Sequence, residues 1–162
     1  MREYEDFELA FDRLLGLAYR HARRLVGDAA LAEDLAAEAL ARTLVRWPKI
    51  RSYEFLDAWV LRVVTNLAIR AFATRAPTAA DAVVAGPDDV AILRVTLAQA
   101  LRALPARQRD AVVLRYLVDM SEDDVAQTLG VAPGTVKSHL HRAVARLRIT
   151  LGPTFDPRFE EH

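Results

Sequence analysis

The sequence predicts an all-α protein made of two small helical domains joined by a flexible linker. Apolar residues recur at three- and four-residue steps over most of the chain, which is the spacing of one face of a helix. Glycine accounts for only 6 of the 162 residues, and no alternating β-branched run is bounded by turn residues. A segment rich in Pro, Gly and acids divides the helical pattern in two.

The composition limits the classes to which the protein can belong. There is no cysteine, which excludes disulfides and thiolate metal sites and fits a reducing cytoplasm. No apolar run approaches the roughly 18 residues that a membrane span needs. The acidic start, MREYEDFELAF, does not have the pattern of a signal peptide. We therefore expect a cytoplasmic protein without membrane insertion.

Three helices are predicted in a first domain, residues 1–76. Gly27 ends the first helix, and Asp28 is a suitable N-cap for the second, which Pro48 is expected to stop. A loop, KIRSYEF, precedes the third helix, which Pro77 ends. The helices are expected at residues 5–26, 29–47 and 55–75. The inward-facing residues are expected to be Phe7, Phe11, Leu14, Leu15, Ala18, Ala22, Leu25, Leu31, Leu35, Ala39, Leu40, Leu44, Trp59, Val60, Val63, Val64 and Leu67.

The second domain is predicted at residues 90–152, after a linker at residues 77–89 and before a tail at residues 153–162. The linker, PTAADAVVAGPDD, combines two Pro and one Gly with small residues and acids, so it has too little apolar surface to pack as an element. Four helices are expected in the second domain, at residues 90–104, 106–118, 122–129 and 133–151.

The last two of these helices have the pattern of a helix-turn-helix. Ser121 is a suitable N-cap, and Asp124 three residues later fits a capping box. Gly130 is the expected left-handed stop, and Pro133 occupies the first position of the next helix. A short helix, a turn with glycine and a longer helix make up this DNA-binding motif.

On a helical wheel the last helix has an apolar face and a cationic face. Val136, Leu140, Ala143 and Leu147 fall together and should face the core. No Asp or Glu occurs between residues 125 and 155, although the whole chain balances 22 basic against 22 acidic residues. Because acids would repel phosphate, this pattern favours insertion into the DNA major groove over a merely solvated face. The candidate DNA-binding residues are Thr135, Lys137, Ser138, His139, His141, Arg142 and Arg146.

Neither a metal site nor a catalytic site is predicted. His139 and His141 are two residues apart on a helix and point about 200° apart, so they cannot hold one ion together. The chain has no glycine-rich phosphate loop and no nucleophile elbow. We expect no cofactor, no metal and no enzymatic activity.

The two halves together resemble the extracytoplasmic-function (ECF) sigma factors, the group-4 specificity subunits of bacterial RNA polymerase. The resemblance covers about residues 5–150. Two segments of the first half resemble sigma region 2, namely AEDLAAEALARTLVRW and FLDAWVLRVVTNLAIR. One segment of the second half resembles sigma region 4, namely LPARQRDAVVLRYLVDMSEDDVAQTLGVAPGTVKSHLHRAVARLR. GTVKSHL alone is also shared with LuxR-type regulators, so it is the order of both halves that makes the resemblance specific. It implies two helical domains, region 2-like at 1–76 and region 4-like at 90–152, and a role in promoter-specific transcription initiation.

The resemblance also implies partners and site residues. The acidic second helix would dock on the clamp coiled coil of core RNA polymerase, the third helix and its preceding loop would hold the −10 element as a single strand, and the last helix would read the −35 element. The implied polymerase-binding residues are Glu33, Asp34, Glu38, Arg42 and Trp47. The implied −10 residues are Arg51, Ser52, Tyr53, Trp59, Arg62, Thr65, Asn66 and Arg70. Helix capping by the acids, a core position for Trp59 and an ordinary solvated loop are the alternatives.

The sequence departs from the family pattern at two places in the first domain. Ala37 stands where Gln is common, and Arg70 stands at an Asp position that normally precedes a basic cluster, of which only Arg75 remains. Two other functions stay open: a helix-turn-helix regulator that acts without core polymerase, and a sigma mimic that titrates an anti-sigma factor. Only about ten residues follow the last helix, too few for a sensing domain. We therefore expect an anti-sigma factor as the regulatory partner.

Overall fold

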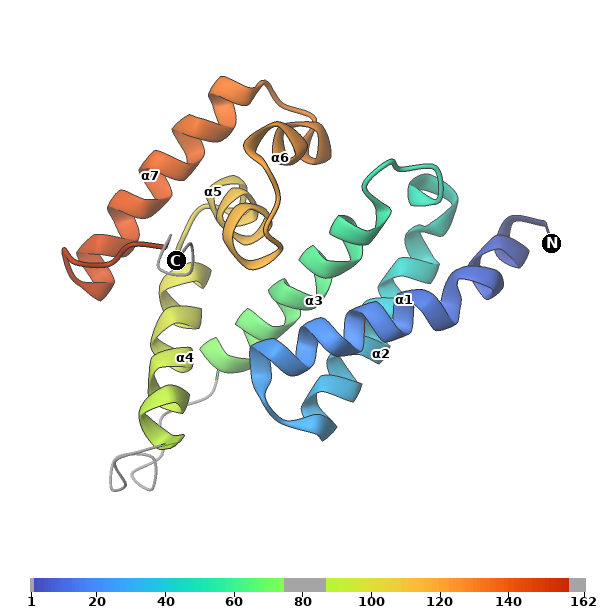
Figure 1. Ribbon diagram of the computed structural model, residues 1–162, viewed down its shortest axis with the longest axis horizontal. Coiled ribbons are helices and arrows are strands. Elements are labelled where there is room, and N and C mark those ends of the chain that lie inside the picture. Colours follow the sequence, from blue (N-terminus) through green and yellow to red (C-terminus); the bar gives the residue numbers. More distant parts are fainter. Residues whose placement is uncertain (1, 75–86, 158–162) are drawn as a thin grey trace. The chain divides into compact units, whose positions relative to one another are not determined.

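The computed structural model describes residues 2–74 and 87–157, and over these residues the chain forms helices and no strand (Figure 1). The all-α prediction is confirmed. The elements are α1 (Arg2–Val26), α2 (Ala29–Ile50), α3 (Leu56–Ala73), α4 (Pro87–Arg102), α5 (Ala106–Val112), the π-helical segment η2 (Val113–Leu117), α6 (Glu122–Leu129) and α7 (Pro133–Leu151). They belong to two compact units, Met1–Ala68 and Ile69–His162.

The predicted linker, residues 77–89, lies outside the described residues apart from its last three. Those three residues form the first turn of α4, which begins at Pro87 rather than at Val90. Pro at a first helical position needs no backbone N–H and has a φ angle that suits a helix, so this Pro can begin the helix. No helix among the described residues has both the length and the apolar character of a membrane span.

Local residue chemistry fixes the connection between α1 and α2. Gly27 adopts a φ of 74°, the left-handed conformation that favours glycine, and its N–H bonds to the Arg23 carbonyl at 3.0 Å. Asp28 is the N-cap of α2, where its Oδ1 accepts a hydrogen bond from the Leu31 N–H at 2.7 Å. Both predictions at this turn are confirmed.

The prediction that Pro48 stops the second helix is wrong. Helix α2 continues through Pro48 to Ile50, and the Arg51 N–H still bonds to the Trp47 carbonyl at 3.0 Å. Proline removes one backbone donor, but so close to a helix end this costs a single bond. Because Trp47 and Ile50 are both buried, their packing keeps this last turn helical.

The core of the first unit forms where the apolar faces of its helices meet. Leu14, Ala18 and Ala22 of α1 are completely buried. The residues Phe7, Leu35, Ala39, Leu40, Val60, Val64 and Leu67 are also buried, as the helical periodicity predicts. Phe11 and Leu44 were expected inside but are 38% and 39% exposed. Leu44 lies at the border of the buried stripe of α2, whereas Phe11 lies within that of α1.

The helix predicted at residues 106–118 changes character halfway. It is α-helical to Val112, and the next five residues form η2, in which the Val118 N–H bonds to the Val113 carbonyl five residues back at 3.0 Å. A π turn of this kind widens the helix by one residue. Since Val112, Val113 and Leu114 are all buried, the wider turn serves to place consecutive apolar side chains in the core of the second unit.

Candidate nucleic-acid interface

Helices α6 and α7 form the predicted helix-turn-helix. The Ser121 hydroxyl accepts a hydrogen bond from the Asp124 N–H at 3.1 Å and caps α6. Gly130 ends α6 with a φ of 66°, and Pro133 takes the first position of α7. The cap of α7 is weaker, since Ala132 at its N-cap offers no side-chain acceptor. The glycine stop and the proline start therefore separate α6 from α7 by a short turn.

The inner face of α7 anchors the helix to the second unit. Val136, Leu140, Ala143 and Leu147 are buried, in agreement with the wheel. Their spacing leaves the rest of the helix surface in solvent over four turns. An α-helix that is held by one narrow stripe can offer its opposite face to a groove.

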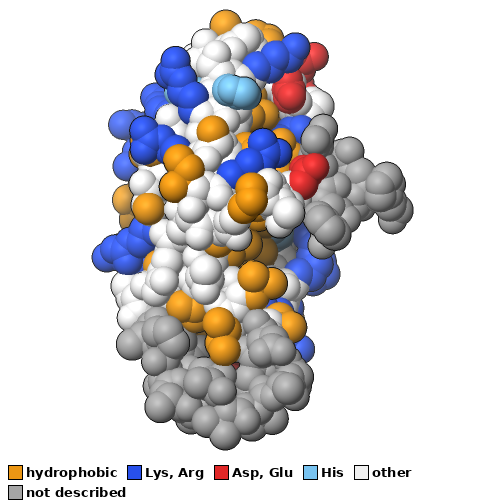
Figure 2. Space-filling model, turned by 90° about the vertical axis from the view of Figure 1, so that its left-hand side faces the viewer, with side chains coloured by type: hydrophobic (Ala, Val, Ile, Leu, Met, Phe, Trp, Pro, Cys, Tyr) orange, Lys and Arg blue, Asp and Glu red, His pale blue; other side chains and the backbone are white. Residues whose placement is uncertain are grey.

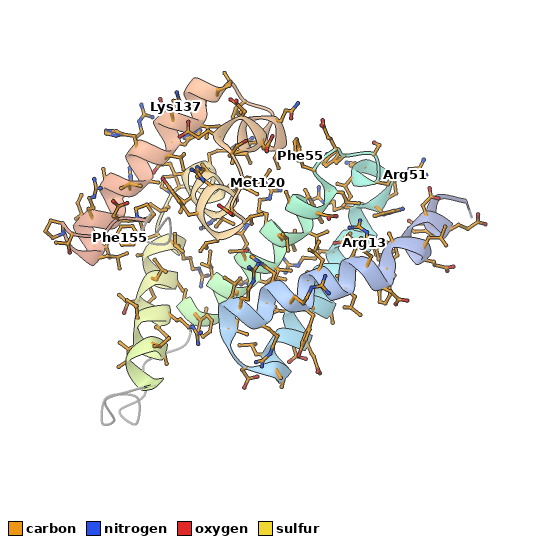
Figure 3. The ribbon with its side chains drawn as sticks, viewed as in Figure 1. Arg13, Arg51, Phe55, Met120, Lys137 and Phe155 are labelled. Carbon is orange, nitrogen blue, oxygen red and sulfur yellow. The ribbon has the colours of Figure 1, made fainter. Side chains whose placement is uncertain are left out.

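The outer face of α7 carries the cationic residues. Thr135, Lys137, Ser138, His141, Arg142 and Arg146 are exposed, and Lys137 projects outward from the helix (Figure 3). Figure 2 views the side on which α7 lies, and there the Lys and Arg side chains greatly outnumber the Asp and Glu side chains. His139 differs from the others because it is half-buried, and its Nδ1 is enclosed without a hydrogen-bond partner among the described residues. Only part of the His139 ring is available to a ligand.

The segment that follows α7 packs back on the C-terminal end of the helix through a hydrogen bond to Arg148. The Arg148 Nε–H donates to the carbonyl of Phe155 at 3.0 Å, so this arginine is partly committed to holding the chain that follows the helix. Phe155 lies close to the end of α7 (Figure 3). The exposed cationic side chains of α7 that precede Arg148 are Lys137, Arg142 and Arg146.

The second predicted surface combines the loop after α2 with α3. Arg51, Ser52 and Tyr53 are exposed, and the Arg51 guanidinium lies 3.5 Å from the Asp6 carboxylate of α1. On α3, Arg70 is exposed and Trp59, Arg62 and Asn66 are half-buried. At about 100° per residue these four α3 residues fall within one side of the helix. The structure therefore brings them together.

Thr65 does not belong to this surface, and its assignment to the −10 site is corrected. Its side chain is 1% exposed and lies on the opposite side of α3. The Thr65 hydroxyl donates to the Leu61 carbonyl at 2.7 Å and lies 2.8 Å from Nε2 of His21 on α1. A buried side chain whose hydrogen-bonding capacity is already used cannot contact a nucleotide.

The acidic surface on α2 is exposed as expected. Glu33, Asp34, Glu38 and Arg42 all face solvent, and Arg42 Nε donates to Glu38 Oε1 at 2.8 Å. No acid lies in the first helical turn of α2, where Asp28 already caps the helix. Capping of the helix therefore accounts for Asp28 but not for Glu33, Asp34 or Glu38, of which Glu38 has a local partner in Arg42.

Trp47 is not part of that surface, and its assignment to polymerase binding is corrected. The side chain is 3% exposed and its ring packs edge-to-face on Phe7 with centroids 5.2 Å apart. The sequence reasoning instead missed Val45, which is 79% exposed. Val45 is three residues from Arg42 and seven from Glu38, so helical spacing places it on the acidic face. The signal available in the sequence was the helical spacing that places this β-branched residue beside Glu38 and Arg42.

The fold strongly changes the ionisation of His21. It is 3% exposed, and burial, assisted by the nearby Arg24 guanidinium, lowers its pKa from 6.5 to about 4. Because the unfolded chain takes up this proton first as the pH falls, the stability that neutral His21 contributes is complete above pH 6.5 and is lost toward pH 4.

Lowering the pH from 6.5 to 5 should therefore reduce the free energy of unfolding of the first unit by about 2 kcal/mol through His21 alone. Both tryptophans, Trp47 and Trp59, lie in this unit, so urea unfolding followed by tryptophan fluorescence measures it. His21→Gln should remove most of this pH dependence, and the exposed His141→Gln should keep it. Equal pH profiles for all three proteins would refute the assignment.

Comparison with known proteins identifies both units. The model of sigma-70 region 2 matches residues 10–78, and that of sigma-70 region 4 matches residues 94–147. The RNA polymerase sigma-E factor of Streptomyces coelicolor is 42% identical over 137 residues, which cover 80% of this chain and 76% of that protein. The ECF RNA polymerase sigma factor SigL of Mycobacterium tuberculosis is 34% identical over 153 residues, with 87% and 86% covered. The chain belongs to the ECF sigma factors of the sigma-70 family.

The fold of this sigma factor agrees with a solved relative. The sigma factor RpoE of Bartonella quintana, solved in complex with the anti-sigma factor NepR, matches with a TM-score of 0.50 at 24% identity. The match covers 91% of this chain and 97% of that one. Sigma factors are regulatory initiation factors rather than enzymes. Among the described residues, no group of three or more His, Asp or Glu could hold a metal ion.

Proposed function

We propose that this ECF sigma factor reads the −35 element with α7, engages the −10 element with α3 and the loop before it, and docks on core RNA polymerase with α2. The observation that carries the proposal is the outer face of α7. It combines exposed Lys137 and Arg142 with a stretch, residues 125–155, that contains no acid. Lys and Arg reach guanine in the major groove, and nearby acids would weaken that contact.

The same proposal assigns residues to the other two contacts. For the −10 strand these are Arg51, Ser52, Tyr53, Trp59, Arg62, Asn66 and Arg70, whose aromatic, amide and guanidinium groups suit stacking and base-edge contacts. For the polymerase these are Glu33, Asp34, Glu38 and Arg42, with Val45 added from the structure. The family membership favours this proposal over a regulator that acts without polymerase and over a sigma mimic.

Run-off transcription with purified core polymerase tests the proposal as a whole. Genomic fragments should yield discrete transcripts only when this sigma factor is added. Duplex binding that does not require polymerase, with no transcripts, would instead support the independent regulator. Capture of an anti-sigma factor with no promoter binding would support the mimic. An anti-sigma partner and a cytoplasmic location, where the polymerase acts, are part of the same proposal.

The C-terminal end of α3 should limit promoter opening, because the basic cluster expected by resemblance is nearly absent there. Introducing arginine at Ala71 and Thr74 should increase open-complex formation and steepen its salt dependence, by roughly 0.7 in logarithmic slope per new phosphate contact with a single strand. Because its −10 contacts are weak, the wild-type protein should depend on the contacts of α7 with the −35 sequence. Transcription from a template without that sequence should therefore be abolished. Quantitative open-complex assays over a salt series measure both effects.

Thr96 offers a matched control for this experiment. Its hydroxyl donates to the Ile92 carbonyl at 2.9 Å, as that of Thr74 does to the Arg70 carbonyl at 2.9 Å, and both threonines are exposed. Thr96→Arg adds to α4 the same single charge that Thr74→Arg adds at the end of α3, and it should leave opening unchanged. If Thr96→Arg helps as much as the substitutions at Ala71 and Thr74, the gain comes from net charge and the explanation fails.

A further inference from the structure

Two polar links join α1 to α3 at the same sequence offset. Arg13 Nη1 donates to the Asp57 carboxylate at 2.8 and 2.9 Å, and His21 Nε2 lies 2.8 Å from the Thr65 hydroxyl. Both pairs are separated by 44 residues. The second link therefore lies eight residues, or about 12 Å, farther along both helices than the first. Only parallel helices in a fixed register can satisfy two such links at once.

The hydrogen bonds around His21 also determine which ring nitrogen carries the proton. Thr65 gives its single hydroxyl proton to the Leu61 carbonyl at 2.7 Å, so its oxygen must accept from His21 Nε2–H. His21 Nδ1 then keeps a lone pair, which accepts from Arg24 Nη2 at 3.2 Å. The buried link is thus directional, because one neutral tautomer of His21 satisfies both neighbours.

The links hold one side of α3 while the proposed −10 residues occupy the other. At about 100° per residue, Asp57, Leu61 and Thr65 fall within an arc of roughly 80°. Trp59, Arg62, Asn66 and Arg70 fall within a similar arc on the opposite side. Sliding α3 by one residue would turn it by about 100° and carry these four side chains away from their common surface.

We propose that His21 and Arg13 are positioning residues, which fix the rotation and axial register of α3 and so hold Arg62 and Asn66 in place for the −10 strand. The inference rests on the proposed function of α3, and it adds the two residues of α1 that hold α3 in position for that function. The contribution of Arg13 is the smaller one because the Arg13–Asp57 pair is half-exposed, whereas the His21–Thr65 pair is buried.

Paired substitutions at Thr65 test the inference in the holoenzyme. Thr65→Val keeps the shape of the side chain but removes the acceptor, whereas Thr65→Ser keeps the hydroxyl. With core polymerase and a promoter recovered by run-off transcription, Thr65→Val should reduce open-complex formation by about threefold to tenfold, the effect of one lost hydrogen bond. Thr65→Ser should form open complexes as well as the wild type does. His21→Gln, whose amide can still donate, should be milder than His21→Leu. Binding to −35 duplex and co-elution with polymerase should not change.

Two outcomes separate failure of this inference from failure of the proposed function. If joint replacement of Arg62 and Asn66 by alanine reduces opening while Thr65→Val does not, α3 contacts the promoter but needs no positioning link, and the inference is overturned. If the alanine variant leaves opening unchanged, the proposed −10 surface itself is wrong. Equal defects in Thr65→Ser and Thr65→Val, with unchanged circular dichroism, would also overturn the inference.

Discussion

Replacing Arg142 with alanine should weaken binding to the −35 duplex by about 1–3 kcal/mol, or roughly fivefold to 150-fold, and should relax the preference for the base that it reads. The guanidinium is exposed at the centre of the outer face of α7, while the inner face stays buried through Val136, Leu140 and Ala143. The substitution therefore removes a contact without disturbing the anchor of the helix. Gel shifts with duplex at fixed salt, repeated on single-base variants, measure both quantities.

Further variants separate base recognition from charge. Arg142→Lys keeps the charge but loses the planar bidentate geometry, so it should recover nonspecific affinity more than sequence preference. Joint replacement of Lys137 and Arg142 by alanine should have the largest effect. Arg107→Ala removes an exposed charge from α5 in the same unit and serves as the control. Unchanged duplex affinity in Arg142→Ala, or an equal loss in Arg107→Ala, would show that α7 does not read DNA in this way.

Reversing the charges of Asp34 and Glu38 together should abolish stable association with core RNA polymerase. The two carboxylates are exposed one helical turn apart on α2, a like-charged arrangement that slightly destabilises an isolated helix. Arg42 offsets it only in part, through its hydrogen bond to Glu38 at 2.8 Å. A cationic surface on the polymerase would relieve this repulsion. Size-exclusion co-elution with core polymerase, alongside circular dichroism, measures association and fold separately.

The matched control is a charge reversal at Glu5 and Glu8 of α1. These residues are also exposed acids on one helix of the first unit, so their reversal changes the net charge by the same amount. It should leave co-elution intact. Val45→Asp should reproduce part of the defect, since Val45 lies on the α2 face. If reversal at Asp34 and Glu38 leaves both co-elution and helicity unchanged, the acids are only solvated.

Much of the fold followed from local chemistry that acts within a few residues. Gly27 and Gly130 end helices because they can take a positive φ, and Asp28 and Ser121 cap helices because their oxygens accept backbone N–H groups. The two faces of α7 were likewise predictable, since a helix converts sequence spacing directly into angle. Family resemblance, rather than spacing, supplied the partners of these surfaces.

Some assignments failed because periodicity gives the relative angle of two side chains but not which side another helix will cover. By composition, Thr65 and Trp47 suited a binding surface as well as a core, and packing against α1 buried both. Pro48 was a reasonable stop, but burial of Trp47 and Ile50 kept its turn helical. Val45, by contrast, was left in solvent.

The presence of the helices, most of their caps, the cationic face of α7 and the family were predictable from the sequence, because each depends on residues close together or on similarity along the chain. Only the tertiary structure revealed the two links between α1 and α3, which join residues 44 positions apart. His21 in the sequence is a histidine on an apolar helix face, with no sign of a partner. Its tautomer, its lowered pKa and its proposed positioning role arise when Thr65 and Arg24 meet it in a buried site, where desolvation makes each hydrogen bond matter.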